Sequence, residues 1–299
     1  MESRRKLIVV AGPTAVGKTN VAIVLAQHFS TEIVSADARQ LYRDMKIGTA
    51  KPPAGELQAA PHHFIDSHSI TESYDAATYG DEALKRIQEL FGKHKIVVMC
   101  GGSGLYIKAV LEGFDDIPEI EPSIRLDLQS AYEEGGLEVL QDKMRLLDPV
   151  YYEKIDTRNP QRLMRALEVV IGTGQSITTF QQRKRRTHDF DIVKIGLELP
   201  REELYNRIDQ RMDKMIEEGL FEEASSLYHY RDHNALQTVG YQEIFDYMDG
   251  RYDRDEAIRL LKQHSRQYAK RQLTWFKRDP EMVWLQATNI NDIIDVASR

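Results

Sequence analysis

The segment Gly12-Pro13-Thr14-Ala15-Val16-Gly17-Lys18-Thr19 decides the fold of this chain. An apolar run, residues 7–11, precedes it, and a stretch suited to a helix, residues 21–26, follows it. A strand, a glycine-rich loop and a helix form the setting in which the pattern G-x-x-x-x-G-K-[ST] binds phosphate groups. The loop turns backbone N–H groups toward the anion, and the helix N-terminus adds partial positive charge. The segment therefore predicts a site for a di- or triphosphate.

Two side chains of this loop have the chemistry that a phosphate site needs. Lys18 supplies a full positive charge for the outer phosphate, and the Thr19 hydroxyl is suited to Mg²⁺. The loop alone does not identify the ligand. An Asn-Lys-x-Asp motif, which would read a purine base, is absent from the sequence. A base-free diphosphate is therefore as compatible with the pattern as a nucleotide.

Composition restricts the class of protein. The 299 residues are 41% hydrophobic and 29% charged, and they suffice for one large domain or two ordinary ones. No apolar run approaches the length of a membrane span, and the first residues lack a signal-peptide pattern, so we expect a cytoplasmic protein. The single cysteine, Cys100, excludes an internal disulfide and ends an apolar run, which favours a buried structural thiol. The net charge of −7 does not by itself indicate a nucleic-acid binder.

Strands alternate with helices through most of the chain, which predicts an α/β fold with a parallel, doubly wound sheet. Beyond residues 7–11, we expect strands at residues 32–36, 62–66, 95–100, 191–197 and 283–285. We expect helices at residues 81–91, 105–111, 200–218 and 257–278, and a loop at residues 46–61. The fold class is thus a P-loop NTPase-like core, its parallel sheet flanked by helices, with an all-helical insertion.

The insertion is predicted because residues 115–189 contain helical patterns and no convincing strand. The expected helices are residues 123–134, 136–147, 160–172 and 175–183. This gives two domains: a core formed by residues 1–114 and 190–299, and an insertion domain formed by residues 115–189.

Asp37 is the carboxylate that the sequence places at the phosphate site. It follows the strand at residues 32–36, at the edge of the sheet where open α/β folds bind ligands. The strand ending at Cys100, where a nucleotide-hydrolysing protein usually has its Mg²⁺-binding acid, is followed by Gly-Gly-Ser-Gly instead. Asp37 can take a proton from an acceptor as a general base. The alternative is an ordinary turn or helix-capping residue.

Two segments are strongly basic: residues 182–186 and the helix at 257–278, which contains no acidic residue. In that helix Ile258, Leu261, Ser265, Tyr268, Gln272 and Trp275 form one stripe, and Arg259, Arg266, Lys270 and Lys277 form the opposite one. Such a basic stripe fits nucleic-acid phosphates. It is also compatible with a solvated face, and aromatic residues at helical spacing are more typical of a core than of a base-stacking platform.

Several motifs in order along the chain give a resemblance to a known family. They are residues 12–19, Ser-Ala-Asp-Ala-Arg-Gln-Leu-Tyr (35–42), Ile-Gly-Thr-Ala-Lys-Pro (47–52), Pro-His-His-Phe-Ile-Asp (61–66), Gly-Gly-Ser-Gly-Leu-Tyr (101–106), Asn-Pro-Gln-Arg-Leu (159–163), Val-Gly-Tyr (239–241) and Lys-Arg-Gln-Leu-Thr-Trp-Phe (270–276). Together they resemble the bacterial tRNA dimethylallyltransferases, members of the IPP transferase family. The motifs cover nearly the whole chain, so the resemblance is specific.

The resemblance implies transfer of a dimethylallyl group from its diphosphate to N6 of the adenosine 3′-adjacent to the anticodon, in tRNAs that read codons starting with U. It implies catalytic roles for Asp37, as the base for the N6 proton, and for Thr14 and Arg211, which would stabilise charge on the diphosphate. The whole loop, Gly12, Pro13, Thr14, Ala15, Val16, Gly17, Lys18 and Thr19, would bind that diphosphate, with Mg²⁺ on Thr19 as cofactor.

The resemblance also implies tRNA contacts. They fall on Asp37, Ala38, Arg39 and Gln40, on Ser103 and Arg125, on Gln161, Arg162, Leu163, Met164 and Arg165, on Gln237, Thr238, Val239, Gly240, Tyr241 and Gln242, and on Lys270, Arg271, Trp275 and Lys277. The partners are then dimethylallyl diphosphate and the anticodon stem-loop of tRNA, clamped by the insertion. We expect a monomer and no membrane association.

Some residues depart from the family pattern. Ala38 stands where Ser is frequent and Ser103 where Thr is more common, and we expect these small residues to tune activity without abolishing it. No C-terminal Cys/His zinc-finger pattern is present, unlike in eukaryotic relatives. The pair His62-His63 suggests a metal site, but the sequence offers few further ligands.

Two other functions are compatible with part of the sequence. A small-molecule P-loop kinase, with Asp37 deprotonating a hydroxyl acceptor, explains residues 1–110 but gives the insertion and the basic helix no function. An RNA-binding protein that uses a nucleotide as a switch lacks the expected Mg²⁺ acid and the purine-reading motif.

Overall fold

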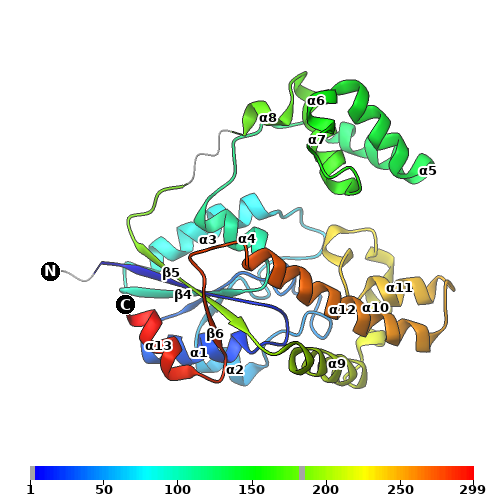
Figure 1. The fold of residues 1–299 in the computed structure, drawn as a ribbon. Helices are drawn as coiled ribbons and strands as arrows, with labels where there is room; N and C mark the ends of the chain where they lie inside the picture. The colour runs from blue at the N-terminus through cyan, green and yellow to red at the C-terminus, as the bar shows by residue number, and fades with distance from the viewer. Residues whose placement is uncertain (1–3, 182–185) are drawn as a thin grey trace. The chain divides into compact units, whose positions relative to one another are not determined.

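One parallel sheet forms the centre of the computed structural model, which describes residues 4–181 and 186–299. Among these residues the sheet has six strands in the order β3-β2-β4-β1-β5-β6 (Figure 1). Their bounds are β1 Lys6–Ala11, β2 Ile33–Ser35, β3 His62–His63, β4 Ile96–Gly101, β5 Asp191–Glu198 and β6 Val283–Gln286. Every pairing between neighbours is parallel. The α/β prediction with a P-loop core is confirmed.

The central strand β1 is buried on both faces. Its alternate side chains point to opposite sides of the sheet, as a strand requires. Leu7 and Val9 belong to one apolar cluster, and Ile8 and Val10 to another. This two-sided burial explains why the strand reads as an unbroken apolar run in the sequence.

Helices cover both faces of this sheet. The clusters place α3 and α4 against one face and α1 and α13 against the other (Figure 1). The helices of this unit are α1 Lys18–His28, α2 Ala54–Ala59, α3 Ala76–Leu90, α4 Gly104–Leu111, α9 Arg201–Glu217, α10 Leu220–Leu227, α11 Gln242–Met248, α12 Arg254–Phe276 and α13 Ile290–Ser298, with short 3₁₀ turns at Tyr228–Tyr230 and Asn234–Leu236.

The chain divides into two compact units. Unit 1 comprises residues 1–111 and 187–299, and unit 2 comprises residues 112–186. The domain boundaries that we expected from the sequence, 114/115 and 189/190, lie close to these divisions. Each unit has its own apolar core.

In the described part of unit 2 the regular secondary structure is helical. Its helices are α5 Pro122–Leu147, α6 Pro149–Tyr152, α7 Pro160–Thr173 and α8 Ile177–Phe180. At Gly136 the backbone of α5 leaves the helical conformation (φ 69°, ψ −162°), which corresponds to the division predicted between residues 134 and 136. The last predicted helix, 175–183, is wrong in length: α8 ends at Phe180, and residues 182–185, four of the five in the basic segment 182–186, lie outside the described residues.

Three local predictions in unit 1 are wrong. The segment 46–61, predicted as loop, contains α2, and β3 covers only two of the residues 62–66. Helix α3 begins at Ala76, five residues before the predicted start, because the Asp75 carboxylate accepts a hydrogen bond from Thr78 N (2.8 Å) and caps the first turn.

The buried face of helix α12 matches the predicted stripe only in part. The residues that it buries are Ala257, Leu261, Ser265, Ala269, Gln272 and Phe276. Tyr268 and Trp275, expected on the buried side, are each 37% exposed. Leu261, Ser265 and Gln272 are buried as the predicted stripe requires, whereas the other buried residues each lie one position away from the predicted ones.

Two basic residues of α12 are paired with acids of a neighbouring helix. Arg266 Nη1 bonds both carboxylate oxygens of Asp209 (2.5 and 2.8 Å), and Lys262 Nζ lies 2.6 Å from Asp213 Oδ1. Both acids belong to α9. Of the predicted basic stripe, Arg266 is therefore paired with an acid of the neighbouring helix. Within the described residues, no helix is long and apolar enough to cross a membrane.

Candidate active site

The predicted phosphate loop connects β1 to α1, as the sequence indicates. Gly17 caps the N-terminus of α1 with φ 102°, a left-handed conformation that glycine adopts without strain. No side chain caps this helix, so its first N–H groups remain available to an anion. Lys18 Nζ donates to Pro13 O (2.7 Å), so the ammonium group of the loop bonds a backbone carbonyl of the same loop.

Burial controls the charge of the lysine in this loop. Loss of solvent lowers the pKa of Lys18 to about 8. The charge of Arg211 lowers the pKa of Lys18 in the same direction as burial, whereas Cys100 and Asp37 raise it. A bound phosphate would supply the negative charge that this buried ammonium lacks. Burial also raises the pKa of the Cys100 thiol to about 12, so the thiol stays protonated, as a structural cysteine would.

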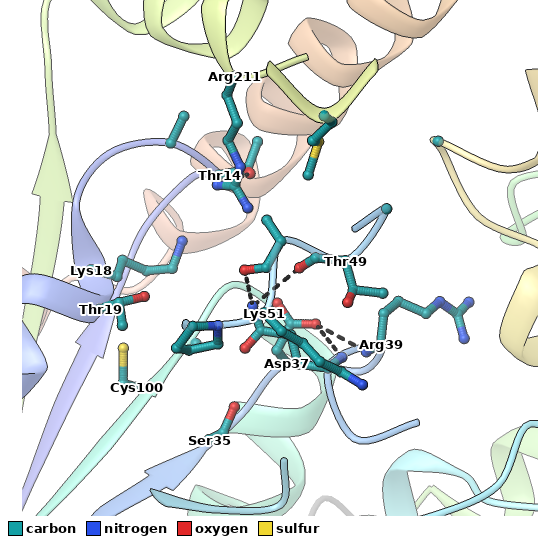
Figure 2. A pocket seen from close by; sticks show the side chains of 18 of the residues that line it. Thr14, Lys18, Thr19, Ser35, Asp37, Arg39, Thr49, Lys51, Cys100 and Arg211 are labelled. Carbon is teal, nitrogen blue, oxygen red and sulfur yellow. Dashed lines mark hydrogen bonds between the residues drawn. The ribbon is translucent and has the colours of Figure 1, made fainter. Parts of the chain in front are cut away.

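Arg211 adds a second cation. It lies on α9 and donates from Nη1 to the Thr14 hydroxyl (3.3 Å). Figure 2 shows Arg211 beside Thr14, with Lys18 and Thr19 facing the same cavity. Two positive groups and a hydroxyl from distant parts of the sequence therefore lie around the place where a diphosphate would sit.

Asp37 faces this cavity from the end of β2. Its Oδ1 accepts hydrogen bonds from the backbone N–H of Arg39 (2.9 Å) and Gln40 (3.2 Å), which closes a tight turn. Within residues 4–181 and 186–299, no donor bonds its other oxygen, Oδ2. One oxygen thus fixes the turn, while the second is available to receive a proton from a ligand.

Ser103 holds the same turn from the other side. Its hydroxyl accepts a hydrogen bond from Ala38 N (2.9 Å), and its own N–H donates to Ala36 O (3.2 Å). We predicted that Ser103 touches tRNA. In the structure Ser103 also bonds the backbone of the Asp37 turn, and its predicted contact with tRNA stays a prediction.

Gln272 is a site residue that the sequence reasoning missed. Its Oε1 accepts from Thr14 N (2.9 Å) and its Nε2 donates to Gly102 O (2.9 Å). The approach requires glycine, because a Cβ on Gly102 would lie 2.4 Å from that Nε2. The buried amide thus ties α12 to both the phosphate loop and the end of β4. A polar residue within an apolar stripe was the only sequence signal.

The cavity has a volume of about 460 Å³. Residues of four predicted groups line it: the phosphate loop, the Asp37 turn, α9 and the loop before α11. The predicted residues among the lining are Thr14, Ala15, Gly17, Lys18, Thr19, Asp37, Arg39, Gln40, Arg211, Thr238, Val239 and Gly240. Val16 instead packs in the core, fully buried, so only its backbone is suited to a ligand.

Three of the residues predicted to contact tRNA have buried side chains, which leaves only their backbone groups suited to such a contact. Tyr241 is fully buried, and its hydroxyl donates to Glu223 Oε1 (2.6 Å). Leu163 and Met164 are core residues of unit 2, 0% and 4% exposed. A sequence motif lists consecutive residues, and it does not distinguish those that face solvent from those that pack in the core.

The neighbours of Leu163 and Met164 on α7 form a polar cluster within unit 2. Gln161, Arg162 and Arg165 are exposed. Glu168, only 4% exposed, bonds both Arg125 on α5 (2.5 Å) and Arg165 (3.2 Å). Arg125 also donates to Gln161 Oε1 (3.2 Å). The cluster presents two guanidinium groups held by one buried carboxylate.

The predicted residues of α12 fall on different sides of the helix. Lys270 lies two positions beyond Tyr268 and two before Gln272, both of which line the cavity. At ~100° per residue, Lys270 points away from that cavity. Lys277 pairs with Glu198 (3.1 Å). Arg271 stacks near the Tyr268 ring (5.8 Å), and with exposed Trp275 it borders the cavity side.

The loop before α11 is joined to the Asp37 turn. Arg39 Nη2 donates to Gln237 O (3.5 Å), and the Gln242 amide donates to Gln237 Oε1 (2.6 Å). These contacts bring residues 237–242 to the turn at residues 37–40, although about 200 residues separate them in sequence.

The histidine pair does not form a metal centre. No group of three or more His, Cys, Asp or Glu residues suited to a metal ion occurs among the described residues. His63 Nε2 instead bonds Glu32 Oε2 (2.7 Å), and His62 Nδ1 bonds Ala60 O (2.8 Å).

The fold and the cavity define a P-loop protein in which a carboxylate, Asp37, lines the same cavity as the phosphate loop. A family model described as "IPP transferase" matches residues 40–279. The chain is 49% identical over 293 residues to the tRNA dimethylallyltransferase of Christiangramia forsetii, covering 97% of each. It is also 49% identical over 287 residues to that of Cytophaga hutchinsonii, covering 96% of this chain and 94% of the relative. This chain belongs to the IPP transferase family and is a transferase.

Solved structures agree with this assignment. The tRNA isopentenylpyrophosphate transferase of Bacillus halodurans has a TM-score of 0.71 and 37% identity, with 99% of this chain and 97% of that chain covered. A eukaryotic dimethylallyltransferase acting on tRNA has a TM-score of 0.78 and 28% identity, with 98% of this chain and 77% of that chain covered. The likeness extends over nearly all of this chain.

Proposed function

We propose that this chain transfers the dimethylallyl group of dimethylallyl diphosphate to N6 of the adenosine 3′-adjacent to the anticodon, in tRNAs that read codons starting with U. The products are N6-dimethylallyladenosine and pyrophosphate. One observation carries the proposal: a single cavity holds the cations Lys18 and Arg211 beside the phosphate loop, and Asp37 from the neighbouring strand. The cations suit a departing diphosphate, and the carboxylate suits an N–H acceptor.

The reaction exchanges one bond for another. The allylic C–O bond breaks and its electron pair leaves on pyrophosphate, while the N6 lone pair forms the new C–N bond. Lys18, Arg211 and the Thr14 hydroxyl lie where negative charge develops on the leaving oxygen, and preformed donors at that point lower the barrier. Asp37 Oδ2 receives the proton that N6 loses.

Thr19 is the side chain suited to the cofactor Mg²⁺. Its hydroxyl lines the cavity next to Lys18. Mg²⁺ usually keeps several waters and takes few protein ligands beside substrate phosphates, so one hydroxyl with two phosphates fits its preference. When bound, the ion would neutralise charge on the leaving pyrophosphate.

The tRNA would contact both units. In unit 1 the adenosine enters against the Asp37 turn and residues 237–240, which requires the base to leave its stack at a cost of a few kcal/mol. In unit 2 the exposed Arg162 and the clustered Arg125 and Arg165 suit phosphates of the anticodon stem. We propose that the enzyme acts as a monomer in the cytoplasm.

A transfer assay tests this function. The protein is incubated with Mg²⁺, dimethylallyl diphosphate and an anticodon stem-loop that carries three adjacent adenosines. Mass spectrometry should find one C5H8 group on N6 of a single adenosine, and a pyrophosphate assay should find an equal amount released. A stem-loop with the target adenosine replaced by guanosine is the matched control and should gain nothing.

A parallel reaction with ATP addresses the kinase alternative. The chain should transfer no phosphoryl group to small hydroxyl acceptors, because β4 ends at Gly101, is followed by Gly102-Ser103-Gly104 and lacks the Mg²⁺-binding acid usual at that position. Phosphoryl transfer from ATP, together with no prenylated adenosine, would refute the proposal.

A further inference from the structure

Residues 46–50 form a cavity wall that has no regular secondary structure. Gly48, Thr49 and Ala50 line the cavity, and Ala50 has a positive φ of 46°. Neither helix nor sheet bonds fix this backbone. A turn bond from Ala50 N to Ile47 O (2.8 Å) closes the segment locally, but the N–H groups of residues 46–48 take their partners from another part of the chain.

One carboxylate makes most of these contacts. Glu223 lies in the first turn of α10, and its Oε2 accepts hydrogen bonds from Lys46 N (3.0 Å) and Ile47 N (2.8 Å). Its Oε1 accepts from Gly48 N (2.9 Å) and from the Tyr241 hydroxyl (2.6 Å). A carboxylate has about four acceptor positions. Those of Glu223 are thus all engaged within the protein.

Tyr241 extends this contact to a second wall of the cavity. It directly follows Thr238, Val239 and Gly240, which line the cavity. Its fully buried ring packs so closely on Gly48 that a Cβ there would lie 2.5 Å away. Burial, with the nearby charge of Glu223, raises the pKa of Tyr241 well above its usual value, so the hydroxyl remains a donor. Glu223 therefore joins two walls.

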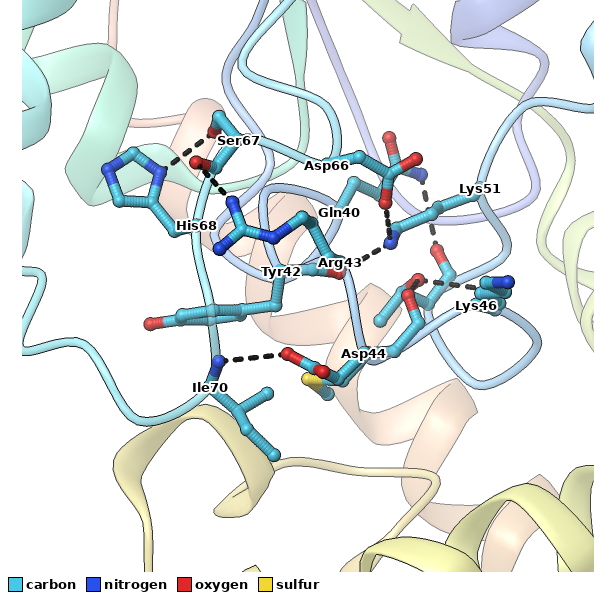
Figure 3. A network of polar contacts seen from close by, with 12 residues as sticks. Gln40, Tyr42, Arg43, Asp44, Lys46, Lys51, Asp66, Ser67, His68 and Ile70 are labelled. Atoms are coloured by element: carbon cyan, nitrogen blue, oxygen red, sulfur yellow. Dashed lines mark hydrogen bonds and ion pairs between the residues drawn. The ribbon is translucent and has the colours of Figure 1, made fainter.

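The far side of the same loop is joined to the Asp37 turn. The Gln40 side-chain amide donates to Thr49 O (3.2 Å) and Ala50 O (3.1 Å), and Gln40 N donates to Asp37 Oδ1 (3.2 Å). Lys51, the next residue of the wall, bonds Tyr42 O and Asp66 (Figure 3). A continuous set of hydrogen bonds thus runs from Glu223 through residues 46–50 to the catalytic turn.

The diphosphate side of the cavity is held by different contacts. Lys18 bonds Pro13 O, Arg211 bonds Thr14, and Gln272 bonds Thr14 N. None of these bonds involves Glu223 or residues 46–50. A substitution of Glu223 should therefore impair use of the acceptor adenosine and leave diphosphate binding unchanged.

We propose that Glu223 is a positioning residue for the acceptor: it sets the walls at residues 46–50 and 238–240 and, through Gln40, the orientation of Asp37. It touches neither substrate. The proposal rests on the proposed function only in that the acceptor adenosine enters against the Asp37 turn. Loss of Glu223 impairs the presentation of the base, while diphosphate binding persists.

Glu223→Gln tests the proposal with a side chain of the same shape. The amide offers one acceptor oxygen instead of two, and its NH2 group faces backbone N–H donors. The kcat/KM for the stem-loop should fall by ~30-fold or more. The Kd for inorganic pyrophosphate, measured by calorimetry, should stay within ~2-fold of wild type. Tyr241→Phe, which removes one of the four donors, should show a smaller loss in the same direction.

Glu222→Gln is the matched control. Glu222 is the exposed neighbour in the same helical turn, so this variant makes the same change of charge near the same helix end. It should keep wild-type kcat/KM and Kd. Equal kcat/KM in the two Gln variants would overturn the proposal, and so would a weakening of pyrophosphate binding that matches the loss of transfer. An inactive wild-type protein would instead refute the proposed function, and this inference with it.

Discussion

Asp37 has two roles that one substitution can separate. Oδ1 closes the turn by accepting from Arg39 N and Gln40 N, and Oδ2 is the proposed proton acceptor. Asn keeps a carbonyl oxygen for the turn but lacks a basic carboxylate. We expect Asp37→Asn to lower kcat for prenyl transfer by ~10²-fold or more, the usual contribution of a general base.

The controls for this substitution are a binding and a stability measurement. Pyrophosphate affinity and the melting temperature of Asp37→Asn should stay near wild type, because the turn survives. Asp37→Ala, which loses the turn as well, should lower the melting temperature too. A fully active Asn variant would exclude Asp37 as the base.

We expect Lys18 to make the proposed diphosphate binding depend on pH. Its pKa of about 8, lowered by burial, means that the ammonium charge is present below about pH 8 and is lost as the pH rises further. The affinity for pyrophosphate should therefore fall as the pH passes through 8. Calorimetric titrations between roughly pH 6.5 and 9.5 would measure this fall, since one pKa unit corresponds to ~1.4 kcal/mol.

Lys18→Arg controls for the titration of the ligand itself. The guanidinium stays charged throughout this range, while the protonation of pyrophosphate is the same for both proteins. The variant should bind with a different affinity but without the additional fall above pH 8. Parallel pH profiles for the two proteins would show that Lys18 does not control binding.

Sequence alone predicted several residues that line the cavity but not the residues that hold its walls in place. Thr14, Lys18, Asp37 and Arg211 were predicted, and the structure places them around one cavity. Gln272 and Glu223 were missed as positioning residues. A Gln in a helical stripe and a Glu in a helix have no local signature, because their partners are backbone groups more than 100 residues away.

At the level of elements, the register of α12 was predicted only in part. Hydrophobic periodicity favours large apolar side chains for the buried positions. Here the small Ala257 and Ala269 are buried in place of Ile258 and Tyr268, and Phe276 is buried in place of Trp275. The strands were predicted well, because a parallel strand covered on both faces must be apolar throughout.

This register leads to a prediction for two adjacent cations, Lys270 and Arg271. Both are exposed, but Lys270 points away from the cavity and Arg271 borders it beside Tyr268. We expect Arg271→Ala to weaken stem-loop binding by ~5- to 10-fold and to reduce the salt dependence by about one phosphate contact. Lys270→Ala should have a much smaller effect, although the sequence motif assigned tRNA contacts to both residues.

Fluorescence anisotropy with a labelled stem-loop, at several salt concentrations, measures both effects. The two variants remove the same charge from neighbouring positions, so each serves as the control for the other. Equal losses would mean that the RNA covers both sides of α12, and that the orientation of the helix does not select the contacts.

At the scale of the whole molecule, the insertion has an apolar core of its own, made of different residues from the core of unit 1. The third apolar cluster consists of residues of unit 2 alone, around Leu140, Leu163 and Leu167. The two clusters on the sheet consist of residues of unit 1. In unit 1 the two ends that flank the insertion lie together, since His188 Nε2 bonds Leu111 O (2.9 Å). A short connection can therefore replace residues 112–186 without stretching the core.

We expect a chain with residues 112–186 replaced by a few glycines to fold and to bind pyrophosphate with a Kd within ~2-fold of the full chain, since every residue of the phosphate site belongs to unit 1. Transfer to the anticodon stem-loop should fall by ~10²-fold or more, because the phosphate contacts proposed for Arg125, Arg162 and Arg165 are lost. Calorimetry and the transfer assay measure the two quantities separately. Undiminished transfer would show that unit 1 alone recognises the stem-loop. Loss of pyrophosphate binding together with transfer would show that unit 1 depends on the insertion for its fold.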